Sequence, residues 1–460
     1  MKNIITEKLE KLKDKLVSFS KETKFIKRKV KLTAHNFLAS LLSSNKTNSD
    51  EMICNNLQED YGVDIKRQSY NERLHKDESV AYLKKIFEHL LAENSIEETE
   101  EMRGITESFN NIFVEDNSTI SLHESMSEKF KGVGGSANTS AMKIYLNYIA
   151  NKRQIADIQI ESGTKNDTKF ANIVIDILKK GDLVLRDLGF FQIDSFIKIK
   201  EKLAYFLSRL KMNTTIYIGD KKMDLFEYIE SKGDFTILDE DVEITAQKLT
   251  VRLTVYKVSE EVYNERVRKL KKSYAKSGKT PSKRLLKLQK YVMFVSNIDR
   301  EMVSKEQIGT LYRLRWQVEL VFKRWKSFMH IAVITSTSKK SEDVANKKGG
   351  KISNRILCFI YAKLISILLM TTIELVAHLL AIHECRELSS DKFVKWILLR
   401  DRLQKLFIGG DSVEDFLVLL QSNIMRLLKD KRIQNPSTLV LLNDGIGFYE
   451  EIGMLGRLEG

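Results

Sequence analysis

The residues Leu311 to Ser327, LYRLRWQVELVFKRWKS, have types and a spacing that could act on phosphate groups. Three arginines, two lysines and two tryptophans surround a single carboxylate, that of Glu319. At about 100° per residue, four side chains share one narrow face of a helix. These four are Tyr312, Arg315, Glu319 and Lys326. One acid between cationic hydrogen-bond donors suits a site where the acid binds a metal ion and the donors bind phosphates around it.

A surface ladder of salt bridges is the simpler interpretation of these charges. Such a ladder needs several acids on the face, and this face carries only Glu319. Apolar Leu314, Val318 and Val321 occupy other angles and could anchor the helix to a core. The pattern therefore favours chemistry, with the ladder as the alternative.

A single carboxylate rarely holds a divalent cation, so other acids should lie nearby. Mg²⁺ takes oxygen ligands and keeps several waters. Asp116 ends the strand-like run IFVED, and Asp187 ends the strand-like run LVLRD. Strand ends next to a helix are where an α/β sheet gathers functional groups. An aspartate at a strand end is also a common turn former, and that alternative applies to each residue taken singly.

The helix fills the pattern Y-x2-R-x3-E-x6-K without a gap. This pattern resembles the signature of bacterial insertion-sequence transposases, specifically the DDE transposases of the "insertion sequence four" family. DLGFF at Asp187 resembles the D-x-G-[YF] block of that family, and VEDNSTISL resembles its D-S-T block at Asp116. Because Asn117 intervenes before the serine and threonine, Asp157 and Asp167 are alternatives for the first acid.

The resemblance implies a cut-and-paste transposase with an RNase H-like α/β fold, a mixed sheet with flanking helices. Asp116, Asp187 and Glu319 would bind two Mg²⁺ ions, with Mn²⁺ possible in their place. Water would first cut the end of the element, and the freed 3′-hydroxyl would then attack the opposite strand and later the target. Tyr312, Arg315 and Lys326 would hold phosphates near the cut. The implied partners are double-stranded DNA, as element ends and target, and a second copy of the chain in the DNA complex.

Charge points independently to a polyanionic partner, because 76 basic residues exceed 62 acidic ones and leave a formal charge of +14. Nucleic acid is the first candidate and an anionic membrane surface the second. The run Arg266 to Lys290 holds eleven basic residues and no acid. We expect its side chains to contact DNA phosphates, although a solvated loop is the alternative. The candidates in this run are Lys269, Lys271, Lys272 and Arg284.

Two other classes of function are disfavoured. The apolar segment Ile356 to Ile382 is interrupted by Lys363 and Glu374, so it predicts a buried helix and no membrane span. The sequence thus indicates a cytoplasmic, nucleoid-associated protein. A zinc site is disfavoured because its possible ligands lack a fourth member and a standard spacing. These ligands are His378, His383 and Cys385.

The pattern of apolar and turn-forming residues along the chain predicts an α/β protein divided into five regions. They are a helical DNA-binding region at 1–105, the first part of the catalytic domain at 106–217, a β-rich insertion with the basic run at 218–298, the second part of the catalytic domain at 299–345, and a helical region at 346–460. Within the catalytic domain we expect strand-like runs, a helical stretch from Lys169 to Lys180 and a long helix from Ile193 to Leu210.

Asp50 to Leu74 predicts two short helices around a turn at Tyr61-Gly62. The second would carry polar side chains suited to a major groove, although a plain helical hairpin explains the pattern as well. Its polar residues are Lys66, Arg67, Gln68, Ser69, Asn71 and Arg73. Two other functions remain compatible with the sequence: a stand-alone nuclease on the same fold, and a DNA-binding remnant that acts as a repressor.

Overall fold

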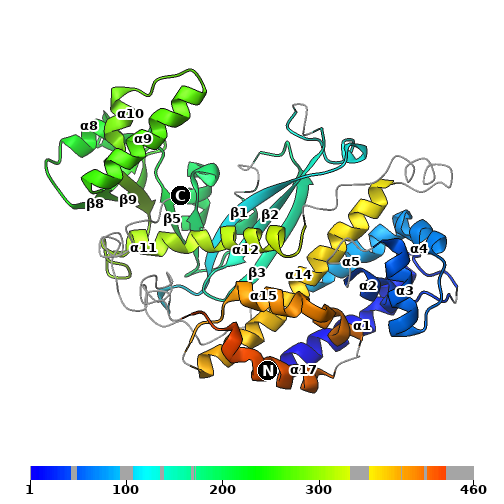
Figure 1. Cartoon of the computed structure of the whole chain (residues 1–460). Helices are drawn as coiled ribbons and strands as arrows, with labels where there is room; N and C mark the ends of the chain where they lie inside the picture. Colours follow the sequence, from blue (N-terminus) through cyan, green and yellow to red (C-terminus); the bar gives the residue numbers. More distant parts are fainter. Residues whose placement is uncertain are drawn as a thin grey trace.

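The structure is a computed structural model with a central sheet, a small lobe at one end of that sheet, and a helical body built from both ends of the chain (Figure 1). It describes residues 2–28, 30–42, 49–93, 107–134, 139–166, 170, 172–331, 352–384, 386–408 and 412–430.

Ten strands form one mixed sheet in the order β3-β2-β1-β4-β5-β10-β9-β8-β6-β7. Strands β1 to β3 form an antiparallel meander, and β4 and β5 run parallel to β1. The bounds are β1 Ile112–Ser121, β2 Ala141–Ile149, β3 Gln154–Ser162, β4 Leu183–Arg186 and β5 Tyr205–Arg209. Three antiparallel strands followed by two parallel ones, with helices on both faces, make the RNase H-like arrangement that the sequence predicted.

The central strands β2 and β4 are buried on both faces, which explains their largely apolar sequences. All nine residues of β2 are buried. In β1 and β4 the side chains alternate between two cores, because successive residues of a strand point to opposite faces. Phe113 and Val184 pack with Phe196 of helix α7 (Ile193–Glu201), whereas Val114 and Leu185 belong to the larger core that contains helix α12 (Trp316–Ser327).

The insertion extends the same sheet, since β10 pairs antiparallel with β5 and then with β9. Its elements are β6 Thr215–Ile218, β7 Lys221–Asp224, α8 Leu225–Glu230, β8 Ile237–Ile244, β9 Leu249–Lys257, α9 Glu260–Lys276, α10 Lys283–Leu288 and β10 Tyr291–Ser296. Figure 1 shows α8, α9 and α10 together in the green lobe. The strands predicted here are confirmed, and the basic run lies in α9, α10 and the segment between them.

Helices from the two ends of the chain pack together and share one core with the sheet. The first group is α1 Lys2–Glu22, α2 Ala34–Leu42, α3 Asp50–Tyr61, α4 Arg67–Leu74 and α5 Asp77–Ala92. The second is α14 Ile352–His383, α15 Ser390–Leu398, α16 Arg402–Ile408 and α17 Val413–Leu427. Long helix α14 lies beside α5, so the blue and yellow segments of Figure 1 meet.

Helix α14 is long and apolar enough to cross a membrane, but 83% of its most apolar window is buried inside the protein. Its interrupting charges also have protein partners. Lys363 donates hydrogen bonds to the carbonyls of Met329 and His330 at 2.8 and 2.9 Å. The prediction of a buried core helix is therefore confirmed.

Two predictions about local structure need correction. The long helix over Ile193 to Leu210 is wrong, because α7 Ile193–Glu201 ends early and Leu203 turns the chain with a φ of 56°. The remainder forms β5, whose ladders with β4 and β10 outweigh the helical pattern of the sequence. In the stretch from Lys169 to Lys180 the described residues, 170 and 172–180, form only the short helix α6 Ile173–Ile177.

The two short helices predicted near the amino terminus are confirmed as α3 and α4. Gly62 ends α3 in the left-handed conformation, with a φ of 63° that glycine adopts without strain.

Candidate active site

Asp116 and Asp187 lie on neighbouring parallel strands, close to where their pairing ends. The last pair in the ladder between β1 and β4 joins Val114 to Leu185. Two residues further along each strand bring Asp116 opposite Asp187, on the face toward α12, because side chains alternate with a period of two. Asp187 also begins the short 3₁₀ turn Leu188–Phe190. Both carboxylates are half-buried.

The predicted helix runs across these strand ends as α11 Ile308–Tyr312, a 3₁₀ turn at Arg313–Arg315, and α12 Trp316–Ser327. The turn contacts both β1 and β4, and α12 contacts β1. The Tyr312 hydroxyl donates a hydrogen bond to the Arg186 carbonyl at 3.2 Å, and its ring packs 5.0 Å from that of Phe294. Tyr312 therefore ties the helix to the end of β4.

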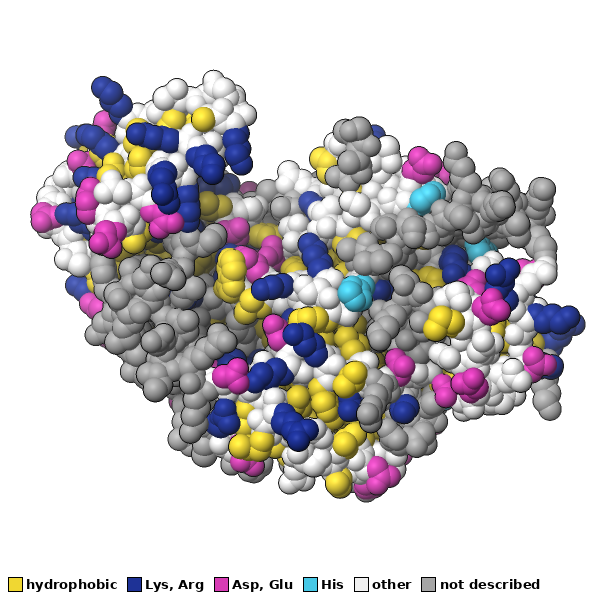
Figure 2. Space-filling model, in the orientation of Figure 1, with side chains coloured by type: hydrophobic (Ala, Val, Ile, Leu, Met, Phe, Trp, Pro, Cys, Tyr) yellow, Lys and Arg dark blue, Asp and Glu magenta, His cyan; other side chains and the backbone are white. Residues whose placement is uncertain are grey.

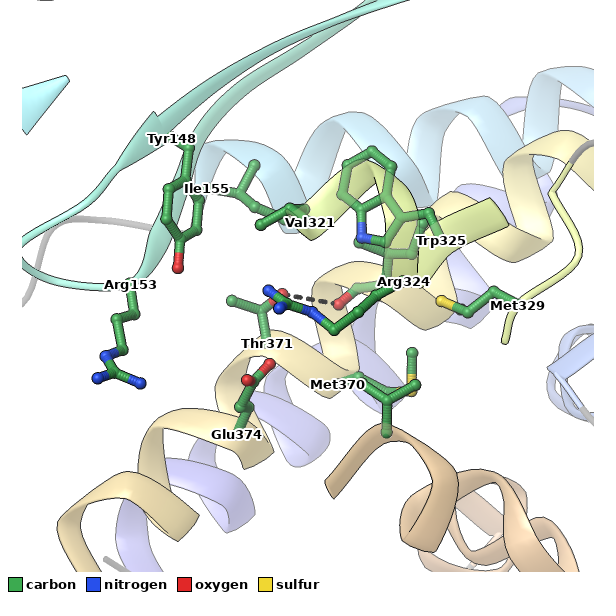
Figure 3. A pocket seen from close by; sticks show the side chains of 12 residues that line it. Tyr148, Arg153, Ile155, Val321, Arg324, Trp325, Met329, Met370, Thr371 and Glu374 are labelled. Atoms are coloured by element: carbon green, nitrogen blue, oxygen red, sulfur yellow. Dashed lines mark hydrogen bonds between the residues drawn. The ribbon is translucent and has the colours of Figure 1, made fainter. Parts of the chain in front are cut away.

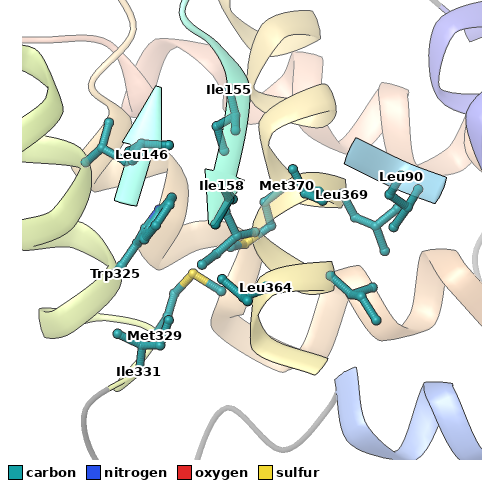
Figure 4. Close-up of a cluster of buried hydrophobic side chains, with 14 of the residues drawn as sticks. Leu90, Leu146, Ile155, Ile158, Trp325, Met329, Ile331, Leu364, Leu369 and Met370 are labelled. Carbon is teal, nitrogen blue, oxygen red and sulfur yellow. The ribbon is translucent and has the colours of Figure 1, made fainter. Parts of the chain in front are cut away.

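Apolar side chains hold α12 in this position from its opposite side. Val318, Val321 and Trp325 are buried in the main core. Figure 4 shows Trp325 beside residues of β2, β3 and α14, so the helix is clamped between sheet and helical body. The anchoring role predicted for Val318 and Val321 is confirmed.

Arg315 and Glu319 form an ion pair one helical turn apart. An Arg315 guanidinium nitrogen (Nη2) donates to Glu319 Oε1 at 2.5 Å, and 14% and 31% of the two side chains are exposed. The charge of Arg315 also reaches Asp116 and Asp187. One guanidinium thus lies near all three acids. A surface ladder of salt bridges along the helix would not require Arg315 to lie near the two aspartates of the sheet.

Neighbouring negative charges affect the pKa of Asp116. Burial raises the pKa of its carboxyl to about 6, and the charges of Glu319 and Asp187 add to this rise. The Asn117 backbone N–H, which donates to Asp116 at 2.8 Å, and the Arg315 guanidinium oppose it. Like charges that raise a carboxyl pKa are typical of sites that receive a cation.

The fit of this site to a divalent ion has one supporting and one opposing feature. The donors are carboxylate oxygens, which Mg²⁺ and Mn²⁺ prefer. Within the described part of the chain, however, no three His, Cys, Asp or Glu side chains are placed to share one ion. Glu319 instead turns toward Arg315. The residues therefore fit a metal provided that the Glu319 side chain exchanges Arg315 for the ion.

The remaining residues predicted for the site lie in different parts of the structure. Lys326 is exposed near the end of α12, two turns beyond Glu319. Asp157 lies on the edge strand β3, separated from β1 by β2, and its carboxylate accepts from Gln159 at 3.0 Å. Asp167 lies outside the described residues. Of the two described candidates for the first acid, Asp116 and Asp157, Asp116 is the one near Asp187 and Glu319.

Sequence reasoning missed a buried ion pair directly behind the aspartates. Glu115 precedes Asp116, Arg186 precedes Asp187, and both side chains are 0% exposed and joined at 2.8 Å. A signal was present, since a glutamate and an arginine interrupt the otherwise apolar runs IFVED and LVLRD.

The basic run forms an exposed surface on the insertion lobe. All 17 residues of α9 are described, and none is buried. Lys271 and Lys272 are exposed, whereas Lys269 pairs with Glu265 at 3.0 Å. Arg284 is engaged internally, with Asp224 at 2.6 Å and the Met212 carbonyl at 3.0 Å. Figure 2 shows lysine and arginine side chains gathered on this lobe.

Helix α4 offers a shorter polar surface than its sequence suggested. Its residues Lys66 to Ser69 are exposed. Asn71 instead donates to Asp50 at 2.6 Å, and Arg73 donates to the Phe25 carbonyl at 2.7 Å. The amino-terminal turn of α4 is thus the part free to meet another molecule.

A small hollow of about 30 Å³ lies behind α12, between β2, β3 and α14. Arg153, Arg324 and Glu374 point toward it in Figure 3. Burial alone would raise the pKa of Glu374, but the hydrogen bond from His378 and the charge of Arg324 lower it to about 2. The hollow has room for about one water and no nucleotide, so its charges brace α12 against α14. Of the disfavoured zinc ligands, His378 contacts Arg153 and Cys385 lies outside the described residues.

Comparison with known proteins places this chain in a family. Residues 107–343, more than half of the chain, match the family described as "Transposase DDE domain". The chain is 30% identical over 416 residues to the transposase for insertion sequence element IS231E of Bacillus thuringiensis subsp. finitimus, covering 85% of this chain and 83% of that protein. It is 27% identical over 376 residues to the transposase for IS1151 of Clostridium perfringens, covering 77% and 76%. The chain belongs to the DDE transposases of insertion sequence elements, the family that its Y-x2-R-x3-E-x6-K helix resembles.

Proposed function

We propose that this transposase moves its element by cut-and-paste, with Asp116, Asp187 and Glu319 as the three acids of its active site. The observation that carries this proposal is their convergence from β1, the end of β4 and α12, with the pKa of Asp116 raised partly by the other two. By the same argument the catalytic domain comprises 106–217 and 299–345, interrupted by the insertion at 218–298. The helical regions at 1–105 and 346–460 flank it.

The three carboxylates would hold Mg²⁺, with Mn²⁺ as a possible substitute. When bound, two such ions activate the attacking oxygen and stabilise the leaving oxygen of an in-line displacement at phosphorus. The role of the chain itself is to hold the two aspartates on a rigid sheet and to present Glu319 near them from a clamped helix. Glu319 would exchange its contact with Arg315 for the ion.

The cationic side of the helix would hold DNA near the cut. With Glu319 bound to an ion, Arg315 would be free of its ion pair and could donate two parallel hydrogen bonds to a phosphate. Burial raises the pKa of Tyr312, so its hydroxyl stays protonated. Because its one proton is donated to the Arg186 carbonyl, Tyr312 would have to give up that bond to hold a phosphate. Exposed Lys326 would add a positive charge for a phosphate further along the DNA strand.

Contacts away from the cut would come from α9, α10 and α4. The exposed lysines of the basic run suit the backbone of double-stranded DNA at the element end or target, and the exposed turn of α4 could enter a groove. We further propose a homodimer in the DNA complex, acting on nucleoid DNA in the cytoplasm. A stand-alone nuclease is the second candidate, because the geometry of the acids alone would serve hydrolysis equally well.

A short duplex carrying the element end tests these assignments. Asp116→Asn, Asp187→Asn and Glu319→Gln should each abolish nicking while retaining DNA binding, because an amide keeps the shape and loses the charge. Asp157→Asn is the matched control on the same sheet and should nick normally. Nicking by Asp116→Asn together with its loss in Asp157→Asn would reassign the first acid. Wild-type protein that nicks but never joins ends would favour the nuclease.

A further inference from the structure

A fully buried ion pair lies directly behind the two aspartates of the proposed site. Glu115 and Arg186 are each the immediate neighbour of one aspartate, and Arg186 Nε donates to Glu115 Oε2 at 2.8 Å. Alternation along the strands sends this pair to the face opposite the one that carries Asp116 and Asp187. The pair therefore links β1 to β4 at the point where the backbone hydrogen bonds between them end.

Neighbouring elements bond to other polar atoms of the pair. The Tyr145 hydroxyl of β2 donates to Glu115 Oε1 at 2.5 Å. The Arg186 guanidinium donates to the Ser195 hydroxyl of α7 and lies 5.9 Å from the Phe196 ring. The network thus spans β2, β1, β4 and α7 in one chain of contacts.

The backbone of Arg186 extends the network to the other face of the sheet. Its carbonyl accepts the hydrogen bond from Tyr312, at the start of the helix that carries Glu319. One residue is therefore bonded through its side chain to the neighbour of Asp116 and through its main chain to the Glu319 helix. It also directly precedes Asp187.

A buried ion pair is weak support for stability, since desolvation of both charges offsets their attraction. A gain in stability therefore does not explain why two charges sit inside an otherwise apolar sheet. A need for fixed geometry does explain it. The planar guanidinium sets the distance and orientation between β1 and β4, whereas apolar packing would let the two strands shift slightly. Groups behind metal ligands commonly act in this way.

We propose that Glu115 and Arg186 are positioning residues that set the separation of Asp116 and Asp187 for binding divalent ions. This inference rests on the proposed function, in which those aspartates are ligands. The pair does not touch the substrate. Its role is to keep the ends of β1 and β4 in register and to fix both relative to α12.

The chain offers a matched control for the general effect of breaking a buried ion pair. Asp239 and Arg252 pair at 2.8 Å in the insertion part of the same sheet, with side chains 8% and 3% exposed. They lie on β8 and β9, three or more strands from β4 in the sheet order. Loss of this pair should lower the melting temperature without altering the proposed metal site.

The experiment compares four purified full-length variants with the wild type: Glu115→Gln, Tyr145→Phe, Asp239→Asn and Asp116→Asn. Two readouts are taken for each, the melting temperature without metal and the Mg²⁺ concentration that gives half of the metal-induced rise in melting temperature. Nicking rate against Mg²⁺ concentration is the supporting measurement. Tyr145→Phe keeps the ring and removes only the hydroxyl, which contacts Glu115 at 2.5 Å and Asn147 of the same strand at 3.0 Å, so it serves if Glu115→Gln fails to fold.

We expect Glu115→Gln to raise the Mg²⁺ midpoint by roughly tenfold or more, the usual scale for losing a group behind a metal ligand. Tyr145→Phe should raise it less, and Asp239→Asn should melt earlier with an unchanged midpoint. Unchanged midpoints in Tyr145→Phe and in any folded Glu115→Gln would overturn the inference, as would an equal shift in Asp239→Asn. A normal metal response in Asp116→Asn would instead overturn the proposed site.

Discussion

Replacing Asp116 with asparagine should stabilise the metal-free protein while it abolishes catalysis. The carboxyl of Asp116 ordinarily titrates near 3.8, and in the folded chain burial raises its pKa to about 6. The folded state therefore binds this proton more tightly than the unfolded state does. Above pH 6 the folded chain carries a charge that its surroundings disfavour, and the amide of asparagine removes that charge.

The magnitude follows from linkage. Each pKa unit corresponds to about 1.36 kcal/mol, so a shift of about two units sets an upper bound of about 3 kcal/mol. Because Asp116 is only half-buried, solvent screening reduces this figure, and we expect about 1–2 kcal/mol. The sign is fixed by the direction of the shift. Stability linked to this group is fully present below about pH 3.8 and is lost as pH rises through about 6.

Thermal denaturation of wild type and Asp116→Asn, measured from pH 4 to 8 in a chelator, tests the argument. The curves should coincide near pH 4 and separate above pH 6, with the variant melting higher. Excess Mg²⁺ should then stabilise the wild type, since a ligand of the native state adds RT ln(1 + [Mg²⁺]/Kd), and should leave the variant unchanged. A variant that melts lower at pH 7.5, or that responds normally to Mg²⁺, would refute the reasoning.

Three further changes separate the roles of the helix and the lobe. Arg315→Ala should impair nicking and end joining more than Lys326→Ala, and Arg315→Lys should recover little, because only the guanidinium forks onto a phosphate; normal joining by folded Arg315→Ala would contradict this role. Glutamine at the exposed Lys271 and Lys272 should flatten the log–log salt dependence of DNA binding, as measured by fluorescence anisotropy, by about 0.9 for each phosphate that the protein no longer neutralises; an unchanged slope would mean a solvated surface. Trp325→Ala should destabilise the protein by about 3–5 kcal/mol in urea titrations by emptying the space between sheet and α14; a change under about 1 kcal/mol would place the anchor of α12 elsewhere.

The part of the site that follows from local spacing was predictable. A helical period of 3.6 residues was sufficient to put Arg315 and Glu319 on one face, and the structure joins them. Strand order was not predictable from local patterns, since the pairing of β1 with β4 depends on residues about seventy positions apart. Asp116 and Asp187 were therefore candidates by motif, and their facing each other emerges only from the sheet.

The wrong helix prediction has the same non-local origin. The segment that forms β5 has a helical pattern, and only the two neighbouring strands make it extended. The pairing of Arg284 with Asp224 was likewise not visible in the sequence, because the two residues are sixty positions apart. Charge counts along a sequence give no information on which cations pair with acids in the fold.

The placement of Glu319 depends on parts of the chain that carry none of the proposed chemistry. Its helix ends where Lys363 of α14 donates to two main-chain carbonyls, and α12 is braced from behind by Arg324 near Glu374. Burying the ammonium of Lys363 lowers its pKa to about 8, so this contact weakens as the lysine loses its proton at alkaline pH. The carboxyl-terminal helices therefore support the proposed active site through the position of α12, and a truncation that removed α14 would free the helix that places Glu319 near the two aspartates on the sheet.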